Sequence, residues 1–122
     1  MDGRVQLPVL EFMKKRFQVD FVDSVTEAGP VRLFANKPSA AASAADERLR
    51  ESVLSRVLVS THAHASKALA LVAHAECAGN PRPKSEQLAM LERALVSLRQ
   101  HFPEIEVIAL WLDADWKVQE LV

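Results

Sequence analysis

The residues best suited to chemistry in this sequence are His74 and Cys77, which are spaced as His-x-x-Cys. An imidazole nitrogen and a thiolate are ligands that zinc prefers in proteins, and Cys77 is the only cysteine of the chain. The spacing is common by chance, so a buried histidine beside an inert core thiol is the alternative interpretation. The residues on either side indicate where this pair would lie.

An unbroken apolar run over residues 68–73 leads directly to His74. Such a run predicts a strand that is buried on both faces, as in a parallel sheet. Gly79, Asn80 and Pro81 follow closely and predict a turn. Because ligands of open α/β sheets bind beyond the carboxyl ends of the strands, we expect His74 and Cys77 at such a site.

Amphipathic patterns predict helices on both sides of this strand. Leu10, Met13 and Phe17 fall at helical spacing and predict a helix over residues 7–17, with Pro8 in its first turn. Further helices are predicted over residues 31–35, from an N-cap at Ser43 to residues 62–64, and from a cap at Ser85 to about His101. Their expected buried stripes are Leu49, Val53, Val57 and Leu58 in one, and Leu88, Leu91, Leu95, Leu98 and Phe102 in the other.

Strands are predicted over residues 19–25, 105–112 and 116–122, and a surface loop over residues 37–45. Alternating helices and strands indicate the α/β class. We therefore expect three layers, with a mostly parallel sheet flanked by helices and an antiparallel hairpin at its C-terminal edge. A chain of 122 residues suits a single domain over residues 1–122.

The overall composition excludes several partners. The net charge is −1, which gives no basic surface for nucleic acid or anionic lipid. No apolar run is long enough to cross a membrane. The N-terminus lacks a signal-peptide pattern, and a single cysteine forms no internal disulfide. Both features favour a cytoplasmic location.

The segment His74-Ala-Glu-Cys77-Ala-Gly79 resembles the second zinc motif of β-class carbonic anhydrases, which also lies at the end of a strand. The first motif of that family is Cys-x-Asp-x-Arg, followed by a helix. This chain begins Met1-Asp2-Gly3-Arg4 and then enters its first predicted helix, so Asp2 and Arg4 match the Asp and Arg of that motif. The resemblance covers nearly the whole chain and is closest to short forms that carry Cys-Ala-Gly-Asn-Pro.

The resemblance implies a carbonic-anhydrase-like fold, a homodimer, and zinc-dependent reversible hydration of carbon dioxide to bicarbonate. Zinc would be held by His74, Cys77 and the cysteine of the first motif, and would lower the pKa of a bound water to about 7. The fourth position would be taken by water or by Asp2. Asp2, if off the metal, would accept a hydrogen bond from that water, whereas Asp2 on zinc would close the site. Arg4 would keep Asp2 off the metal through a two-pronged pair.

The printed sequence departs from the family where the first motif should begin. Its cysteine would lie immediately before Met1, and neither that cysteine nor the strand that should carry it is present. Either the true start lies upstream of Met1, or the chain is truncated, or the protein has lost half of the site. We expect an N-terminally truncated domain with an incomplete zinc site, inactive in this form. The alternative is a non-catalytic dimeric binding or structural protein on the same scaffold. Nucleotide binding is disfavoured, because no glycine-rich loop joins a strand to a helix.

Several other residues have plainer explanations. His62 and His64 have the spacing of a metal-binding pair, but they lie near a predicted helix end, where the helix dipole favours histidine. The same explanation suits His101. Glu27 ends a predicted strand, where it could face the site, but we expect a solvated loop residue. Trp111 and Trp116 flank a predicted turn and are expected to serve packing.

Overall fold

The computed structural model describes residues 1–36 and 43–121. Its elements follow in the order α1 (Gly3–Phe17), α2 (Val31–Ala35), α3 (Ala44–Ala63), β1 (Ala68–His74), α4 (Lys84–His101), β2 (Glu106–Leu112) and β3 (Val118–Leu121). Most of the predicted loop over residues 37–45 lies outside the described residues, as does Val122 at the end of the predicted last strand. None of the helices in the described part of the chain is long and apolar enough to cross a membrane.

The described strands form one sheet in the order β1-β2-β3. β1 pairs with β2 in parallel, with Leu71 opposite Ala109, and β2 pairs with β3 antiparallel. The α/β class and the C-terminal hairpin are therefore confirmed. One parallel and one antiparallel pairing do not establish the mostly parallel sheet that the sequence predicted.

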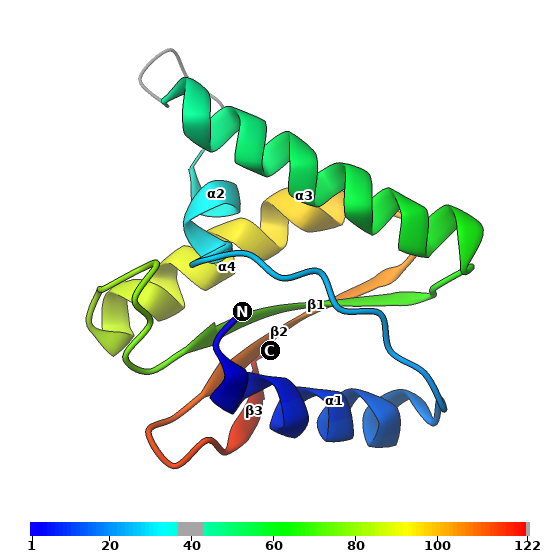
Figure 1. Cartoon of the computed structure of the whole chain (residues 1–122), viewed down its shortest axis with the longest axis horizontal. Helices are drawn as coiled ribbons and strands as arrows, with labels where there is room; N and C mark the ends of the chain where they lie inside the picture. The colour runs from blue at the N-terminus through cyan, green and yellow to red at the C-terminus, as the bar shows by residue number, and fades with distance from the viewer. Residues whose placement is uncertain (37–42, 122) are drawn as a thin grey trace.

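Helices cover both faces of this sheet (Figure 1). On one face, Met13 of α1 packs against Ile108 and Leu110 of β2. The other face carries the larger core, to which α2, α3, α4, β1 and β2 all contribute. Its helical members include Val53, Val57, Leu91, Leu95 and Leu98, all buried as predicted, whereas Leu58 is 43% exposed. Each fully buried Leu or Val contributes about 1.5–3 kcal/mol, so these two cores hold the sheet in place.

The predicted strand over residues 19–25 is wrong, because these residues form no strand ladder. The segment is a coil that runs from α1 to α2, between α3 and β1 (Figure 1). Phe21 is 90% exposed and Val19 is 41% exposed, although alternation would have buried both. A strand needs a neighbour to accept its backbone hydrogen bonds, and none lies beside this segment in the described sheet.

Helix α1 begins earlier than predicted, because Asp2 caps it. The Asp2 carboxylate accepts a hydrogen bond from the backbone N–H of Arg4 at 3.0 Å, as an N-cap does. Pro8 consequently lies inside the helix and not in its first turn. Ser43 caps α3 as predicted, accepting from the N–H of Asp46. In α4 the predicted cap at Ser85 is wrong, since the helix already begins at Lys84.

Two glycines hold the end of the coil against the turn that follows β1. Gly29 has a left-handed backbone with φ of 55°, and a Cβ placed there would lie 2.4 Å from the carbonyl oxygen of Gly79. A Cβ on Gly79 would in turn lie 2.5 Å from the backbone of Ala28. Backbone meets backbone at this point, so neither position can accept a side chain without displacing the main chain.

We expect Gly29→Ala and Gly79→Ala each to lower the free energy of unfolding by at least about 2 kcal/mol, because each inserts a methyl group into a closed backbone contact. Such a loss corresponds to a fall in Tm of about 10 °C for a domain of this size. Thermal unfolding followed by circular dichroism measures it.

Gly3→Ala is the matched control, since a Cβ at Gly3 would meet nothing within 4 Å. Gly3 lies in the first turn of α1, where alanine is the better helix former, so its Tm should be unchanged or higher. If either Gly29→Ala or Gly79→Ala unfolds at the wild-type temperature, the backbone contact does not hold the turn.

Candidate functional site

His74 is the last residue of β1, and its surroundings fix the orientation of its ring. Its Nδ1 lies 2.7 Å from the carbonyl oxygen of Ala75, and a carbonyl can only accept, so Nδ1 carries the proton. In the neutral ring this leaves the lone pair on Nε2 free for a metal or a proton. The side chain of Gln87, which is only 2% exposed, donates to the carbonyl of His74 at 3.2 Å. The strand end that carries His74 is thus tied to α4.

Cys77 lies in the turn immediately after β1 and is buried with a free thiol. The backbone N–H of Asn80 donates to the carbonyl of Cys77, which closes the turn. Glu76, just before the cysteine, has a left-handed backbone with φ of 57°, uncommon for a residue with a long side chain. This sharp reversal allows His74 and Cys77 to line the same groove.

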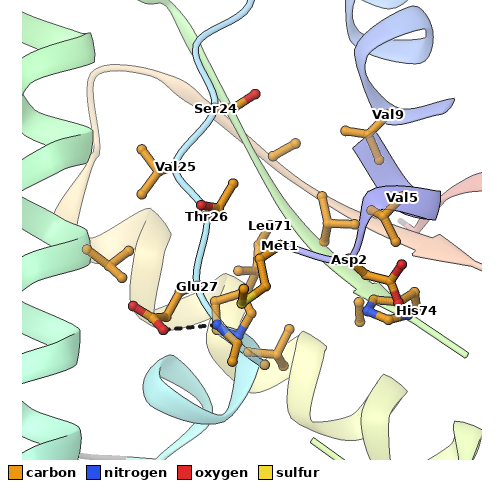
Figure 2. A pocket seen from close by; sticks show the side chains of 18 of the residues that line it. Met1, Asp2, Val5, Val9, Ser24, Val25, Thr26, Glu27, Leu71 and His74 are labelled. Atoms are coloured by element: carbon orange, nitrogen blue, oxygen red, sulfur yellow. Dashed lines mark hydrogen bonds between the residues drawn. The ribbon is translucent and has the colours of Figure 1, made fainter. Parts of the chain in front are cut away.

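Asp2 and Arg4 form the two-pronged pair that the resemblance implied. Arg4 donates from Nε to Oδ1 of Asp2 at 3.0 Å and from Nη2 to Oδ2 at 2.7 Å. Hydrogen bonds from the Arg4 side chain and then from its backbone N–H hold the pKa of the Asp2 carboxyl well below its usual range, with a smaller contribution from His74. Asp2 therefore carries its negative charge at neutral pH beside the imidazole of His74 (Figure 2).

His74, Cys77 and Asp2 all line an apolar groove of about 460 Å³. One wall is β1, which carries Leu71 and His74, and the opposite wall is the coil. From the coil, Ser24 and Thr26 point toward β1, while Val25 points toward α3 (Figure 2). Helix α1 closes one side through Val5 and Val9 (Figure 2), and α3 contributes Val53 and Val57. Met1 also lines the groove, so the chain enters α1 from inside it.

The groove lies in the plane of the sheet. Along β1, Ala70 and Val72 pack against the α1 core while Leu71 packs against the core on the other face. The coil does the same, since Val22 belongs to the α1 core and Val25 to the opposite one. β1 and the coil therefore each contribute to both cores, and the groove lies between them. Along this groove, the edge of β1 has no strand partner among the described residues. That environment suits an extended backbone with apolar side chains.

Polar contacts join the coil to α3 and the residue that follows it, on the side of the coil away from β1. Nδ1 of His64, at the end of α3, lies 2.6 Å from the carboxylate of Asp23. Hydrogen bonds from Ser60 and then His64 lower the pKa of Asp23. Glu27 lines the groove and pairs with Arg56 of α3 at 3.6 Å, so it is not the solvated residue that the sequence predicted.

The remaining histidines fit their plain explanation. Nδ1 of His62 lies 3.0 Å from the carbonyl of Leu58, and Nδ1 of His101 lies 3.0 Å from that of Ser97. Each ring thus bonds a carbonyl four residues earlier, near the C-terminal end of a helix, where such carbonyls lack partners.

The described residues offer zinc fewer ligands than a catalytic site requires. No group of three or more His, Cys, Asp or Glu side chains in residues 1–36 and 43–121 could hold a metal ion. His74 and Cys77 are the right kinds of ligand, but both oxygens of Asp2 bind Arg4, which leaves the pair without a third protein ligand. The donor set therefore does not fit a complete zinc site, and no catalytic step through zinc follows from it.

The sequence did not predict the hydrogen bond of Gln87 to the strand end, the left-handed backbone of Glu76, or the contact of Trp116 with Arg4, whose guanidinium carbon lies 4.3 Å from the indole ring centre. Gln87 gave one weak signal, a polar residue one position before the apolar stripe of α4. Glu76 and Trp116 gave none, because their left-handed backbones follow from the turns that contain them.

Comparisons with known proteins place this chain in a family. The family model described as "Putative carbonic anhydrase" matches residues 1–122. No curated protein and no solved structure gives a significant match. Because the family match spans the whole chain, this protein belongs to the family of those carbonic-anhydrase-like proteins.

Proposed function

We propose that this chain carries the greater part of a zinc-dependent carbonic anhydrase site, whose substrates would be carbon dioxide and bicarbonate. The observation that carries the proposal is that His74, Cys77 and Asp2 line one groove and that Arg4 holds the Asp2 carboxylate. His74 has a free Nε2 lone pair, and Cys77 lies in the next turn. The family match supports the same chemistry.

In this proposal, His74 and Cys77 would hold zinc in a site completed by a third ligand, and Asp2 would accept a hydrogen bond from water there. Arg4 holds both oxygens of Asp2, so Asp2 serves as a partner of the bound water and not as the third ligand. Zinc, when bound, would lower the pKa of that water to about 7 and so supply hydroxide at neutral pH. A third protein ligand is still required, so the chain as printed should lack hydratase activity.

The groove indicates where the third ligand would be delivered. Met1 lies within it, and the first motif of the family places a cysteine one residue before this position. A strand beside β1 that ended in such a cysteine would bring its thiolate to the part of the groove that His74 and Cys77 line. The apolar walls of the groove favour a strand buried on both faces.

The alternative function is a non-catalytic binding module on the same scaffold. The apolar groove, at about 460 Å³, favours it, because the groove does not require a metal to bind an extended or apolar ligand. The two functions differ in metal content. Stoichiometric zinc in the completed site supports the enzyme, and a completed site that takes up no zinc supports the binding module.

A homodimer is part of the proposed function. Leu7 and Leu10 lie one turn apart on α1 and are 60% and 37% exposed, although both are large and apolar. The edge of β1 also lacks a strand partner among the described residues. A two-fold partner that packs against α1 would cover this apolar face.

The first prediction of this function concerns zinc. The chain of residues 1–122 should retain no stoichiometric zinc after dialysis, because it offers two ligands where a catalytic zinc site has three. An N-terminal extension made of an apolar strand and a cysteine directly before Met1 should bind about one equivalent, because His74 and Cys77 then gain a third ligand. Metal analysis and competition with a chromophoric chelator measure both.

Two variants of the extended chain test the ligand assignment. An extension that ends in serine should bind no zinc, although its strand is unchanged. Cys77→Ser in the extended chain should weaken zinc binding at least about a hundredfold, because a hydroxyl is a far poorer ligand than a thiolate. Zinc retention by the printed chain together with carbon dioxide hydration, or unchanged affinity in Cys77→Ser, would show that the assignment is wrong.

The second prediction concerns association. At micromolar concentration, the chain should sediment as a dimer and not as a species of 13.5 kDa. The interface should bury more than about 1,000 Å² in total, as stable associations do. Leu7→Asp should raise the dissociation constant of the dimer at least about tenfold, because it places a charge in an apolar interface.

Val96→Asp is the control for association. Val96 is 57% exposed, as Leu7 is 60% exposed, but it lies on α4 and not on α1. The charge and the exposure are therefore matched, and only the position differs. A monomer for the unchanged chain, or equal weakening by the two variants, would contradict an interface built on α1.

A further inference from the structure

Trp116 lies in the turn between β2 and β3, in a backbone conformation that bulky residues rarely adopt. Its φ is 60°, in the left-handed region. The turn is held by Asp113, whose side chain accepts from the N–H groups of Asp115 at 2.9 Å and Lys117 at 3.0 Å. The backbone N–H of Trp116 donates to the carbonyl of Asp113 at 3.1 Å. These hydrogen bonds hold the backbone of the turn that carries the indole, at a cost of about 1–3 kcal/mol of backbone strain.

The indole contacts the candidate site directly. The guanidinium carbon of Arg4 lies 4.3 Å from the centre of the Trp116 ring, which is a cation–π contact. The rings of His74 and Trp116 are 6.1 Å apart and inclined at 47°. Trp116 therefore joins the arginine of the Asp2–Arg4 pair to a proposed metal ligand, although it belongs to neither motif.

Arg4 is held by three groups. Asp2 binds it through two hydrogen bonds, Glu76 lies 3.7 Å from its Nη1, and Trp116 stacks on its guanidinium. Glu76 and Trp116 are both non-glycine residues with left-handed backbones, and both direct their side chains at Arg4. Because strained backbone collects at functional sites, two such residues on one guanidinium indicate that its position matters.

The indole supplies what the ion pair lacks. The side chain of Arg4 is 51% exposed, and an exposed ion pair in water holds its geometry weakly. An aromatic face on the guanidinium restricts its rotation and removes water from one side of it. The two-pronged geometry with Asp2 is then maintained at the surface. Without the aromatic ring, Arg4 and Asp2 would exchange their hydrogen bonds with water.

We propose that Trp116 is a positioning residue that holds the Arg4 guanidinium in place and, through it, the carboxylate of Asp2 beside His74. This inference rests on the proposed function, which gives the Asp2–Arg4 pair its purpose. The contact between Arg4 and Trp116 does not itself involve a metal. The plain alternative is that Trp116 only packs the turn between β2 and β3.

The test uses the metal-free chain as printed and observes the Nε–Hε group of Arg4 by nitrogen-15 NMR, with Arg4→Lys to assign its signal. In the unchanged chain, the Trp116 ring should shift the Hε signal upfield, and the hydrogen bond to Asp2 should slow its exchange with water. Trp116→Leu should abolish the upfield shift and speed the exchange about three- to tenfold, because it removes the cation–π contact.

Two further variants separate positioning from packing. Trp116→Phe keeps an aromatic face and should retain most of the shift and the slow exchange. Asp115→Ala changes an exposed residue of the same turn and should leave the Arg4 signal unchanged. If Trp116→Leu folds and its Arg4 signal matches that of the unchanged chain, or if Trp116→Phe behaves like Trp116→Leu, the inference is wrong.

The outcome is independent of the zinc experiment. An extended chain that bound no zinc would remove the proposed function and leave the Arg4–Trp116 contact standing. An unaltered Arg4 signal in Trp116→Leu would remove the positioning role and leave zinc binding untouched. If Trp116→Leu does not fold, Trp116→Phe and Trp116→His provide graded changes of the aromatic face. The exchange of Hε with water should then become faster from Trp116 to Trp116→Phe to Trp116→His.

Discussion

The close backbone contact between Gly29 and Gly79 is the constraint on which the site depends. It joins the end of the coil to the turn that contains Cys77, two segments that are 50 residues apart in the chain. No ladder of backbone hydrogen bonds connects the coil to β1, so such bonds do not fix the position of the coil along the strand. The contact instead fixes one end of the coil against the site, and the pairs of Asp23 with His64 and Glu27 with Arg56 fix it against α3. The groove therefore has two walls of defined position.

Much of the fold followed from apolar periodicity. The runs that became β1 and β2, and the stripes of α3 and α4, were predicted because burial on one or two faces leaves a pattern in a single segment. The strand prediction for residues 19–25 was wrong because it used only the pattern within that segment. Its pattern was suited to a strand, but pairing depends on a neighbour, and no pattern within the segment can report whether that neighbour exists.

The candidate site could be predicted only in part. His74 and Cys77 were located by residue type and spacing, and Asp2 and Arg4 by the family resemblance. The support for them was not visible in the sequence. Gln87 reaches the carbonyl of His74 from a helix that begins ten residues later, and Trp116 reaches Arg4 from the opposite end of the chain. Contacts of this type depend on how elements pack, so they appear only when the fold is known.

The groove and the site share one geometrical cause. Side chains of β1 and of the coil contribute to the cores on both faces, so the space between these segments has apolar side chains above and below and an unpaired strand edge at its side. An extended backbone satisfies all three features at once: it supplies hydrogen bonds to the edge of β1 and alternate apolar side chains to each core. Its carboxyl end would then lie beside those of β1 and β2, where His74 already stands. Under the proposed function, a strand in this position would therefore also carry the third zinc ligand.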